Sequence, residues 1–185
     1  ERFNEYFEKS TITLIEQIDH LSHIAGTFSN FARMPEAHFE RVDLVARLTS
    51  VIQLFINNNE SVELKYICDE KEIFIYADSE QLVQVFNNLL KNALQAIPND
   101  KKGRIEVEMR VNEETVVIEI TDNGTGISEE NMEKLFIPNF TTKSAGMGLG
   151  LSIAKNIIEI AGGSIHFNSR LNEGTTFVIV FPLAV

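Results

Sequence analysis

Residues 84–93 read QVFNNLLKNA, a stretch that predicts an amphipathic helix over residues 79–97. The apolar side chains on one face of this helix recur at spacings of three and four residues: Leu82, Phe86, Leu89, Ala93 and Ile97. The opposite stripe carries four amides: Gln84, Asn88, Asn92 and Gln95. A solvated stripe usually carries Glu and Lys, and Asn is a poor helix former. The amides therefore indicate either a plain polar surface or a face that binds a ligand.

If the amide stripe binds a ligand, its chemistry points to a metal ion beside phosphates. An amide oxygen is a neutral, hard ligand for Mg2+, which takes its remaining oxygens from phosphates and water. A carboxylate in the same place would add negative charge next to a triphosphate. The stripe is thus a candidate site for a magnesium nucleotide.

Residues 121–127 read TDNGTGI and follow an apolar segment that reads as a strand. Asn-Gly alone is typical of a tight turn. A turn does not explain the acid at the end of the strand or the second glycine beyond it, Asp122 and Gly126. A carboxylate held there can accept a hydrogen bond from an exocyclic amine such as N6 of adenine, and Gly126 lets the backbone approach a flat ring.

Residues 146–151 read GMGLGL and open a helix predicted over residues 149–161. Glycines permit positive φ there, and the amides at the helix start, reinforced by the helix dipole, suit a phosphate chain. The run is neither the dinucleotide fingerprint G-x-G-x-x-G nor a Walker loop, because no G-K-[ST] follows. A glycine hinge without a ligand is the alternative. Just upstream, Lys143 is either a solvated lysine or a phosphate contact.

The rest of the chain alternates predicted helices and strands. A coiled-coil-like seam runs through residues 1–34, and Pro35 ends that helix. Asp43 is the expected N-cap of a helix to about residue 57, and Ser79 that of the helix to residue 97. Predicted strands cover residues 62–68, 72–77, 104–111, 115–121, 164–169 and 175–181. We therefore expect an α+β two-layer sandwich, one mixed sheet with three helices on one face, preceded by a long N-terminal helix.

Composition and charge argue against several classes of protein, although an acidic chain can still bind a nucleotide. The 185 residues are 44% apolar, and 16 basic against 27 acidic side chains give a net charge of -11. This charge argues against a nucleic-acid partner and against direct contact of this chain with an anionic membrane. The single cysteine, Cys68, excludes an intrachain disulfide and is expected to be buried. No apolar run is long enough to span a bilayer, and the four histidines lack metal-ligand spacing.

In their order and spacing, these stretches resemble the boxes of the histidine-kinase branch of the GHKL ATPase superfamily. Residues 84–93 are similar to its asparagine box, and residues 122–126 to its first glycine box. Residues 136–143 resemble its phenylalanine box, residues 146–150 its second glycine box, and residues 174–175 its last. The resemblance covers roughly residues 40–183, and five boxes in order are far more specific than any one of them.

The resemblance implies the Bergerat fold, with a mobile ATP lid over residues 123–147. By the same resemblance Asn92 would coordinate Mg2+, Asn88 would lie near the phosphates, and Asp122 would select adenine. Asn88 and Lys143 are the implied catalytic residues. ATP and Mg2+ are the implied cofactors.

Further roles in the nucleotide site follow from the resemblance. Gly126 would admit the ring, Thr175 would hold a water near adenine, and Lys143 with the turn at 146–150 would hold phosphates. The implied nucleotide-binding residues are Asn88, Asn92, Asp122, Gly124, Gly126, Ile127, Phe136, Thr142, Lys143, Gly146, Met147, Gly148, Leu149, Gly150 and Thr175.

The N-terminal helix resembles the second helix of the family's dimerisation and phosphotransfer hairpin, especially in nitrogen-regulation-type sensors. The expected division is residues 1–38 as an incomplete hairpin and residues 39–185 as the ATP-binding catalytic domain. The family's phosphoacceptor pattern, His-acid-x-x-Asn-Pro, is absent, and His20 and His23 lack that context. We expect the phosphorylated His upstream of Glu1, so this fragment would bind ATP but not autophosphorylate normally.

The resemblance also implies a place in a two-component system. A protein-histidine kinase of this kind would form a homodimer through its N-terminal helix and pass the phosphate to an Asp of a response regulator. It would work in the cytoplasm, with or without an inner-membrane anchor in the full-length protein. The alternatives are an ATPase of the same superfamily and a non-catalytic dimerisation or sensory module. Those ATPases place a Glu one turn before the metal-binding Asn, where this chain has Asn88, which favours phosphotransfer.

Overall fold

The computed structural model describes Thr11, Ile15, Gln17, Ile18 and residues 37–57, 62–141 and 148–184. The chain divides into two compact units, residues 1–36 and residues 37–185. In the first unit the four described residues are helical and exposed, and the rest of the expected N-terminal helix lies outside the described residues. Among the described residues, no helix combines the length and apolar character that a bilayer crossing requires.

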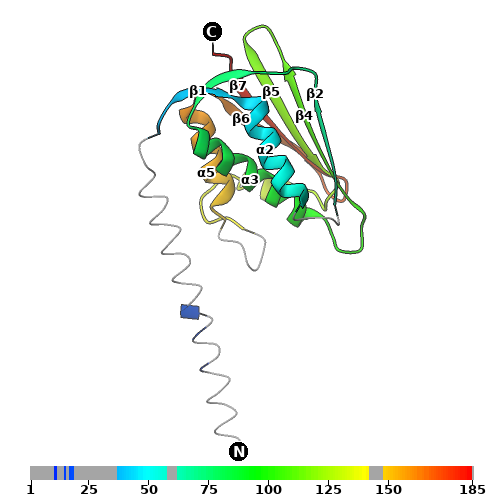
Figure 1. Cartoon of the computed structure of the whole chain (residues 1–185). Coiled ribbons are helices and arrows are strands. Elements are labelled where there is room, and N and C mark those ends of the chain that lie inside the picture. Colours follow the sequence, from blue (N-terminus) through cyan, green and yellow to red (C-terminus); the bar gives the residue numbers. More distant parts are fainter. Residues whose placement is uncertain are drawn as a thin grey trace, which may run out of the picture. The chain divides into compact units, whose positions relative to one another are not determined.

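Five strands form the main sheet of the second unit, in the order β2-β4-β5-β7-β6 (Figure 1). They span Val62–Cys68 (β2), Gly103–Val111 (β4), Thr115–Asp122 (β5), Ser164–Arg170 (β6) and Gly174–Pro182 (β7). β2 runs parallel to β4, and the other neighbours are antiparallel. The predicted mixed sheet is therefore confirmed.

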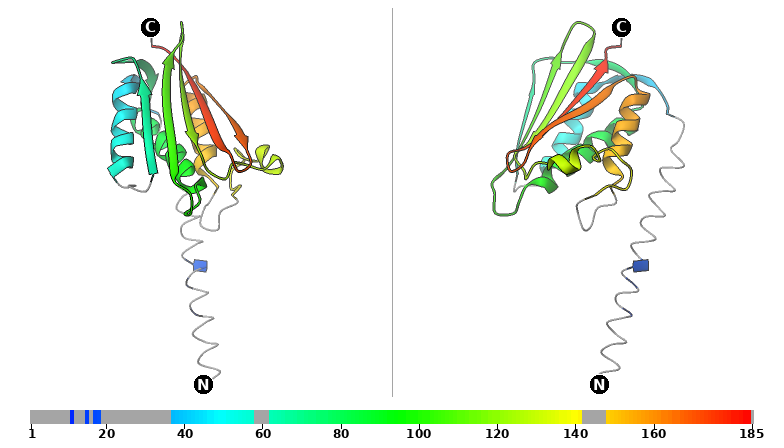
Figure 2. Two further views of the ribbon diagram at one scale, coloured as in Figure 1. Left: turned by 90° about the vertical axis from the view of Figure 1, so that its right-hand side faces the viewer. Right: turned by 180° about the vertical axis from the view of Figure 1, so that it is seen from behind.

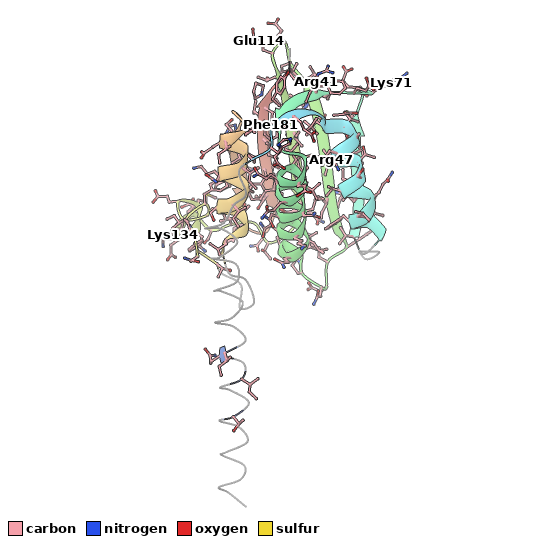
Figure 3. The ribbon with its side chains drawn as sticks, turned by 60° about the vertical axis from the view of Figure 1, so that its left-hand side comes forward. Arg41, Arg47, Lys71, Glu114, Lys134 and Phe181 are labelled. Atoms are coloured by element: carbon pink, nitrogen blue, oxygen red, sulfur yellow. The ribbon has the colours of Figure 1, made fainter. Side chains whose placement is uncertain are left out.

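Three helices cover one face of this sheet: α2 (Leu44–Asn57), α3 (Ser79–Ala96) and α5 (Gly150–Ile160) (Figure 2). The apolar face predicted for α3 points inward, since Leu82, Phe86 and Leu89 are fully buried. On the sheet side of this core, Phe181 of β7 is also fully buried (Figure 3). The two-layer α+β sandwich with three helices on one face is confirmed.

A second, two-stranded sheet was not expected. β1 (Glu40–Asp43) pairs antiparallel with β3 (Phe74–Ala77), so the strand predicted at 72–77 does not belong to the main sheet. The sequence did not predict β1, because a single buried apolar residue, Val42, gives no alternating pattern. In the structure Val42 is paired with the buried Ile75. The exposed side of the pair is held differently, since the Arg41 guanidinium lies 3.7 Å from the Phe74 ring centroid.

Acidic side chains cap two of the helices. The expected cap of α2 is confirmed, since Asp43 Oδ1 accepts from the backbone N–H of Val45 at 3.0 Å and of Ala46 at 3.3 Å. The expected cap of α3 was one residue late. Asp78, not Ser79, is the N-cap, and its Oδ1 accepts from the N–H groups of the first turn.

Asp78 also holds the chain that leads into β1. Its second carboxylate oxygen accepts from the backbone N–H of His38 at 2.8 Å. Partial burial would raise the pKa of Asp78, but the N–H donors of Gln81, His38 and Glu80 outweigh it and lower that pKa. One carboxylate thus joins residue 38 to the start of α3.

The expectation that Cys68 is buried was wrong, because the residue is half-buried. It ends β2, which is an edge strand of the main sheet and has a neighbour on one side only. Its thiol lies 3.5 Å from the carbonyl oxygen of Glu70. An edge strand cannot enclose its last residue as a central strand does.

Candidate functional site

The helix-covered face of the sheet ends in a row of polar side chains. Apolar residues cross β5, β7 and β6 in register: Ile118, Ile179 and Ile165, then Ile120, Phe177 and Phe167. The next row in the same register is Asp122, Thr175 and Ser169, called here the polar row. Asp122 and Thr175 are only 4% and 5% exposed. Burial of polar groups is costly without hydrogen bonds, so the polar row is a constructed feature at the end of the core.

Hydrogen bonds hold the polar row together. Asp122 Oδ1 accepts from the N–H of Gly124 at 2.7 Å. Ser169 Oγ donates to the carbonyl of Gly174 at 3.0 Å, accepts from the N–H of Ile127 at 2.9 Å, and lies 2.9 Å from Thr175 Oγ1. Sequence reasoning missed Ser169. The signal was available, because strand alternation puts Ser169 on the face of Ile165 and Phe167, where an apolar residue would be expected.

Two glycines let backbone segments meet beside this row. Gly174 has φ +131°, and a Cβ there would lie 2.0 Å from the carbonyl oxygen of Asp122. Gly126 has φ +66°, and a Cβ there would lie 2.0 Å from the carbonyl oxygen of Arg170. Gly126 was expected to admit a ligand ring. Its absent side chain already has a structural reason, which is the close approach of the β6–β7 turn.

The Asn-Gly turn after β5 fastens α3 to the sheet. Asn123 Oδ1 accepts from the N–H of Arg104 at 2.9 Å, and the N–H of Thr125 donates to the carbonyl of Ala96 at 2.9 Å. A Cβ on Gly124 would lie 2.5 Å from that same carbonyl. The last turn of α3 and the end of β5 are therefore fixed relative to each other.

The amide stripe of α3 divides into two pairs. Gln84 and Gln95 are exposed, whereas Asn88 and Asn92 are half-buried. Asn88 Nδ2 donates to the carbonyl of Gly150, the first residue of α5, at 3.2 Å. A plain solvated stripe would not make this contact, so α3 presents Asn88 toward the start of α5.

The start of α5, defined as Gly148, Leu149 and Gly150, has an apolar residue at its N-cap position. Leu149 is the N-cap, it makes no side-chain cap hydrogen bond, and the first turn of the helix contains no acidic residue. Ser152 Oγ donates to the carbonyl of Leu149 at 2.9 Å. The first amides of a helix need acceptors, and the helix dipole gives this end partial positive charge. The α5 start therefore suits an anion.

Between α4 (Glu129–Met132) and α5, the backbone of Gly148 contacts the backbone of Phe140. Gly148 has φ +66°, and a Cβ there would lie 2.3 Å from the carbonyl oxygen of Phe140. Residues 140 and 148 therefore lie side by side. Thr142, Lys143, Gly146 and Met147, all expected at the site, lie outside the described residues.

Phe136 anchors this segment to the far edge of the sheet. Its ring meets the Phe167 ring edge-on, with the centroids 5.9 Å apart, and Lys155 Nζ lies 5.3 Å from its centroid. Lys134, two residues earlier, projects at the α5 side of the domain, away from α2 (Figure 3). The described contacts of Phe136 are thus with side chains of β6 and α5.

The two groups of residues fit the two halves of a nucleotide. The carboxylate of Asp122 and the hydroxyl of Thr175 are acceptors suited to the amine of a base such as adenine. The amides at the α5 start, with Asn88 beside them, suit phosphates, and the amide oxygen of Asn92, one turn further along α3, suits Mg2+. The described residues contain no group of three or more His, Cys, Asp or Glu side chains that could hold a metal ion.

Comparisons with known proteins agree with this chemistry. The family model "Histidine kinase-, DNA gyrase B-, and HSP90-like ATPase" matches residues 77–185. Sporulation kinase B of Bacillus subtilis is 34% identical over 171 residues, which cover 91% of this chain and 40% of that protein. Sensor histidine kinase ZraS of Escherichia coli is 31% identical, over 93% of this chain and 37% of that protein. The chain thus spans about two fifths of the length of these relatives.

Solved structures extend the similarity to the fold. The catalytic domain of histidine kinase ThkA superposes with a TM-score of 0.70 at 32% identity, covering 78% of this chain and 95% of that one. ThkA in complex with response regulator protein TrrA gives a TM-score of 0.75 at 27% identity, covering 91% of this chain and 49% of that one. The chain therefore belongs to the histidine kinase-, DNA gyrase B- and HSP90-like ATPase family and carries the ATP-binding catalytic domain of a histidine kinase.

Proposed function

We propose that this domain binds Mg-ATP and transfers the γ-phosphate to a histidine on a helical hairpin, for relay to an aspartate of a response regulator. One observation carries the proposal. The polar row offers acceptors at the end of the sheet, and the α5 start offers helix N-terminal amides beside Asn88, with no cap from the side chain of Leu149. These two groups together match a base at one end and a phosphate chain at the other.

Each group has a distinct role in this proposal. Asp122 accepts a hydrogen bond from the adenine amine, and Thr175 accepts from a water or an amine beside it. Asn92 supplies an amide oxygen to Mg2+, while the amides at the α5 start hold phosphate oxygens. Lys143, together with Thr142, Gly146 and Met147, completes the phosphate contacts when the lid closes. The bound Mg2+ would neutralise charge on the phosphates.

The residue one turn before Asn92 favours phosphotransfer over hydrolysis. An enzyme that hydrolyses ATP needs a base near the attacking water, and a carboxylate serves that purpose. Asn88 occupies this position and already donates its amide N–H to Gly150. An amide cannot take a proton from water, so the domain holds ATP for an incoming histidine instead.

The remaining parts of the proposal concern the full-length protein. Residues 1–38 are proposed as the second helix of a hairpin through which two copies pair, and residues 39–185 as the catalytic domain. The structure of ThkA with TrrA supports a response regulator as the downstream partner. Because the substrate is cytoplasmic ATP, we place the domain in the cytoplasm, without a nucleic-acid partner.

Calorimetric titration of this chain with Mg-ATP tests the binding step. The parent is expected to bind in a Mg-dependent manner, and Asp122→Asn to lose about a hundredfold in affinity, as for a buried hydrogen bond to a charged group. Asn92→Ala is expected to bind ATP with the same affinity in Mg2+ as in EDTA, because it lacks the amide oxygen that binds the metal. Gln84→Ala, an exposed amide of the same stripe, is the matched control and should equal the parent. Site variants that all bind like the parent would refute the assignment.

A second measurement tests the reaction itself. The full-length protein incubated with γ-labelled ATP is expected to take up phosphate that is labile in acid and stable in base, as phosphohistidine is. Release of free phosphate faster than this uptake would instead support the ATPase alternative.

A further inference from the structure

We propose that Ser169 is a specificity-determining positioning residue. It fixes the direction of the Thr175 hydroxyl, so that the polar row offers only acceptors to the base and selects a 6-amino purine over a 6-oxo purine. This inference rests on the proposed binding of ATP and concerns a residue that does not itself touch the nucleotide.

The hydrogen bonds around Ser169 determine where each proton lies. A serine hydroxyl has one hydrogen and two acceptor lone pairs. That hydrogen is donated to the carbonyl of Gly174, at 3.0 Å. The N–H of Ile127 can only donate, so it occupies one lone pair of Ser169 Oγ, at 2.9 Å. The hydrogen and one lone pair of Ser169 Oγ are therefore already used, and one acceptor lone pair remains.

The contact between Ser169 and Thr175 must therefore run in one direction. The two hydroxyl oxygens are 2.9 Å apart, and Ser169 has no second hydrogen to give. The Thr175 hydroxyl is consequently the donor. Its proton points toward Ser169, which leaves lone pairs on Thr175 Oγ1 for any group on its other side.

The other side of Thr175 faces Asp122. The two residues are direct partners in the β5–β7 register, so their side chains lie on the same face of the sheet and are neighbours. An ionised carboxylate only accepts hydrogen bonds. With Ser169 in place, the pair Asp122 and Thr175 is therefore an acceptor pair. It fits an amine with two N–H groups, directly or through a water, and opposes the carbonyl oxygen that inosine and guanine carry at the same position.

Loss of the Ser169 hydroxyl would release this constraint. The Thr175 hydroxyl could then rotate and donate toward the base, and a 6-oxo group would gain a partner. The loss would also free the N–H of Ile127, although residues 125–127 keep a second tie to the β6–β7 turn. There the N–H of Asn172 donates to the carbonyl of Thr125 at 2.6 Å. The segment should therefore stay in place while the selectivity changes.

The test compares Mg-ATP with Mg-ITP, because inosine triphosphate replaces the 6-amino group with a carbonyl. Dissociation constants for both are measured by calorimetry on the parent, Ser169→Ala, Ser169→Thr and Arg170→Ala. Arg170 is the next residue on β6 and forms an exposed ion pair with Glu173, so it is the control for a general disturbance of the strand. In Ser169→Ala the preference for ATP over ITP should fall about tenfold, the effect of one hydrogen bond. Ser169→Thr, which keeps the hydroxyl, and Arg170→Ala should retain the preference of the parent.

The outcomes separate this inference from the proposed function. A parent that does not bind Mg-ATP would refute the proposed function itself. A parent that binds, with Ser169→Ala showing the parent's ratio of ATP to ITP affinity, would overturn the role of Ser169 alone. A uniform loss of affinity for both nucleotides would assign Ser169 a structural role and also overturn the inference. If Ser169→Ala is unfolded by circular dichroism, Ser169→Cys, with similar shape and weak hydrogen bonding, decides the question by the same ratio.

Discussion

The polar row and the α5 start lie in one domain but are built in opposite ways. In the polar row, side chains of three adjacent strands bond to one another and to nearby backbone, and two of the three residues are almost fully buried. At the α5 start, the N-cap residue Leu149 makes no side-chain cap hydrogen bond, and Gly148 has φ +66° against the backbone of Phe140. The first region has its shape before a ligand arrives. The second region keeps donors available, which suits a phosphate group that changes during the reaction.

The largest effect is expected from Gly174→Ala, which would break the polar row. The new Cβ would lie 2.0 Å from the carbonyl oxygen of Asp122, at φ +131°. Strain and collision together should lower the free energy of unfolding by about 3–4 kcal/mol, measured by urea denaturation.

Gly162→Ala is the matched control for this substitution. Gly162 also has positive φ, +74°, but its Cβ would meet nothing closer than Pro182 Cγ at 3.7 Å. This control should lose about 1 kcal/mol, for the backbone conformation alone. Equal losses in the two variants would show that the approach of β7 to Asp122 is not tight.

Gly148→Ala should produce a smaller effect that separates the two regions. Its Cβ would lie 2.3 Å from the carbonyl oxygen of Phe140, so the α5 start must shift. We expect affinity for Mg-ATP to fall about tenfold, as when one phosphate contact is lost, while affinity for adenosine stays that of the parent. Competition titrations with both ligands measure this difference. Parallel losses for ATP and adenosine would mean that the two regions are not independent.

The smallest effect is expected at Asp78, which lies outside both regions. Asp78→Asn keeps a good N-cap residue but removes the charge, and it should cost about 1 kcal/mol or less at neutral pH. Because the folded-state pKa lies below the ordinary value of 3.8, the contribution of the charge is complete above that value and is lost as the pH falls through the folded pKa. Urea denaturation near neutral pH and at about pH 3 should show the gap between parent and variant shrinking in acid. A gap that widens in acid would contradict the lowered pKa.

Most of the fold followed from periodicity in the sequence. The helix at 79–97 was predicted from its apolar spacing, and the strands of the main sheet were predicted from their β-branched and aromatic content. β1 was not, because a strand of four residues with one buried side chain leaves almost no pattern. The cap of α3 was misplaced by one residue because Asp78 and Ser79 are both good capping residues, and only geometry chooses between them.

The candidate site also contains residues that the sequence indicated and residues that only the structure showed. Asp122 and the asparagines of α3 stood out as polar residues in unusual places, whereas Thr175 was named only through the resemblance. The structure brings Asp122 next to Thr175 and Asn88 next to Gly150. Ser169 was missed although strand alternation places it on the buried face of β6, and its partner Thr175, six residues away across a turn, became apparent only in the structure. The glycines also have a structural reason that the sequence did not display. Backbone packing, which no single sequence displays, accounts for Gly126 and Gly174.

The order of the strands has a consequence for how the site comes into being. β7 lies between β5 and β6, although β6 precedes it in the chain. Since synthesis proceeds from the N-terminus, β6 has no sheet partner until residues 174–182 have been made and inserted. The same step delivers Thr175 to Asp122. Nascent or truncated chains that lack β7 therefore cannot assemble the base-binding half of the site, so nucleotide binding reports a finished domain.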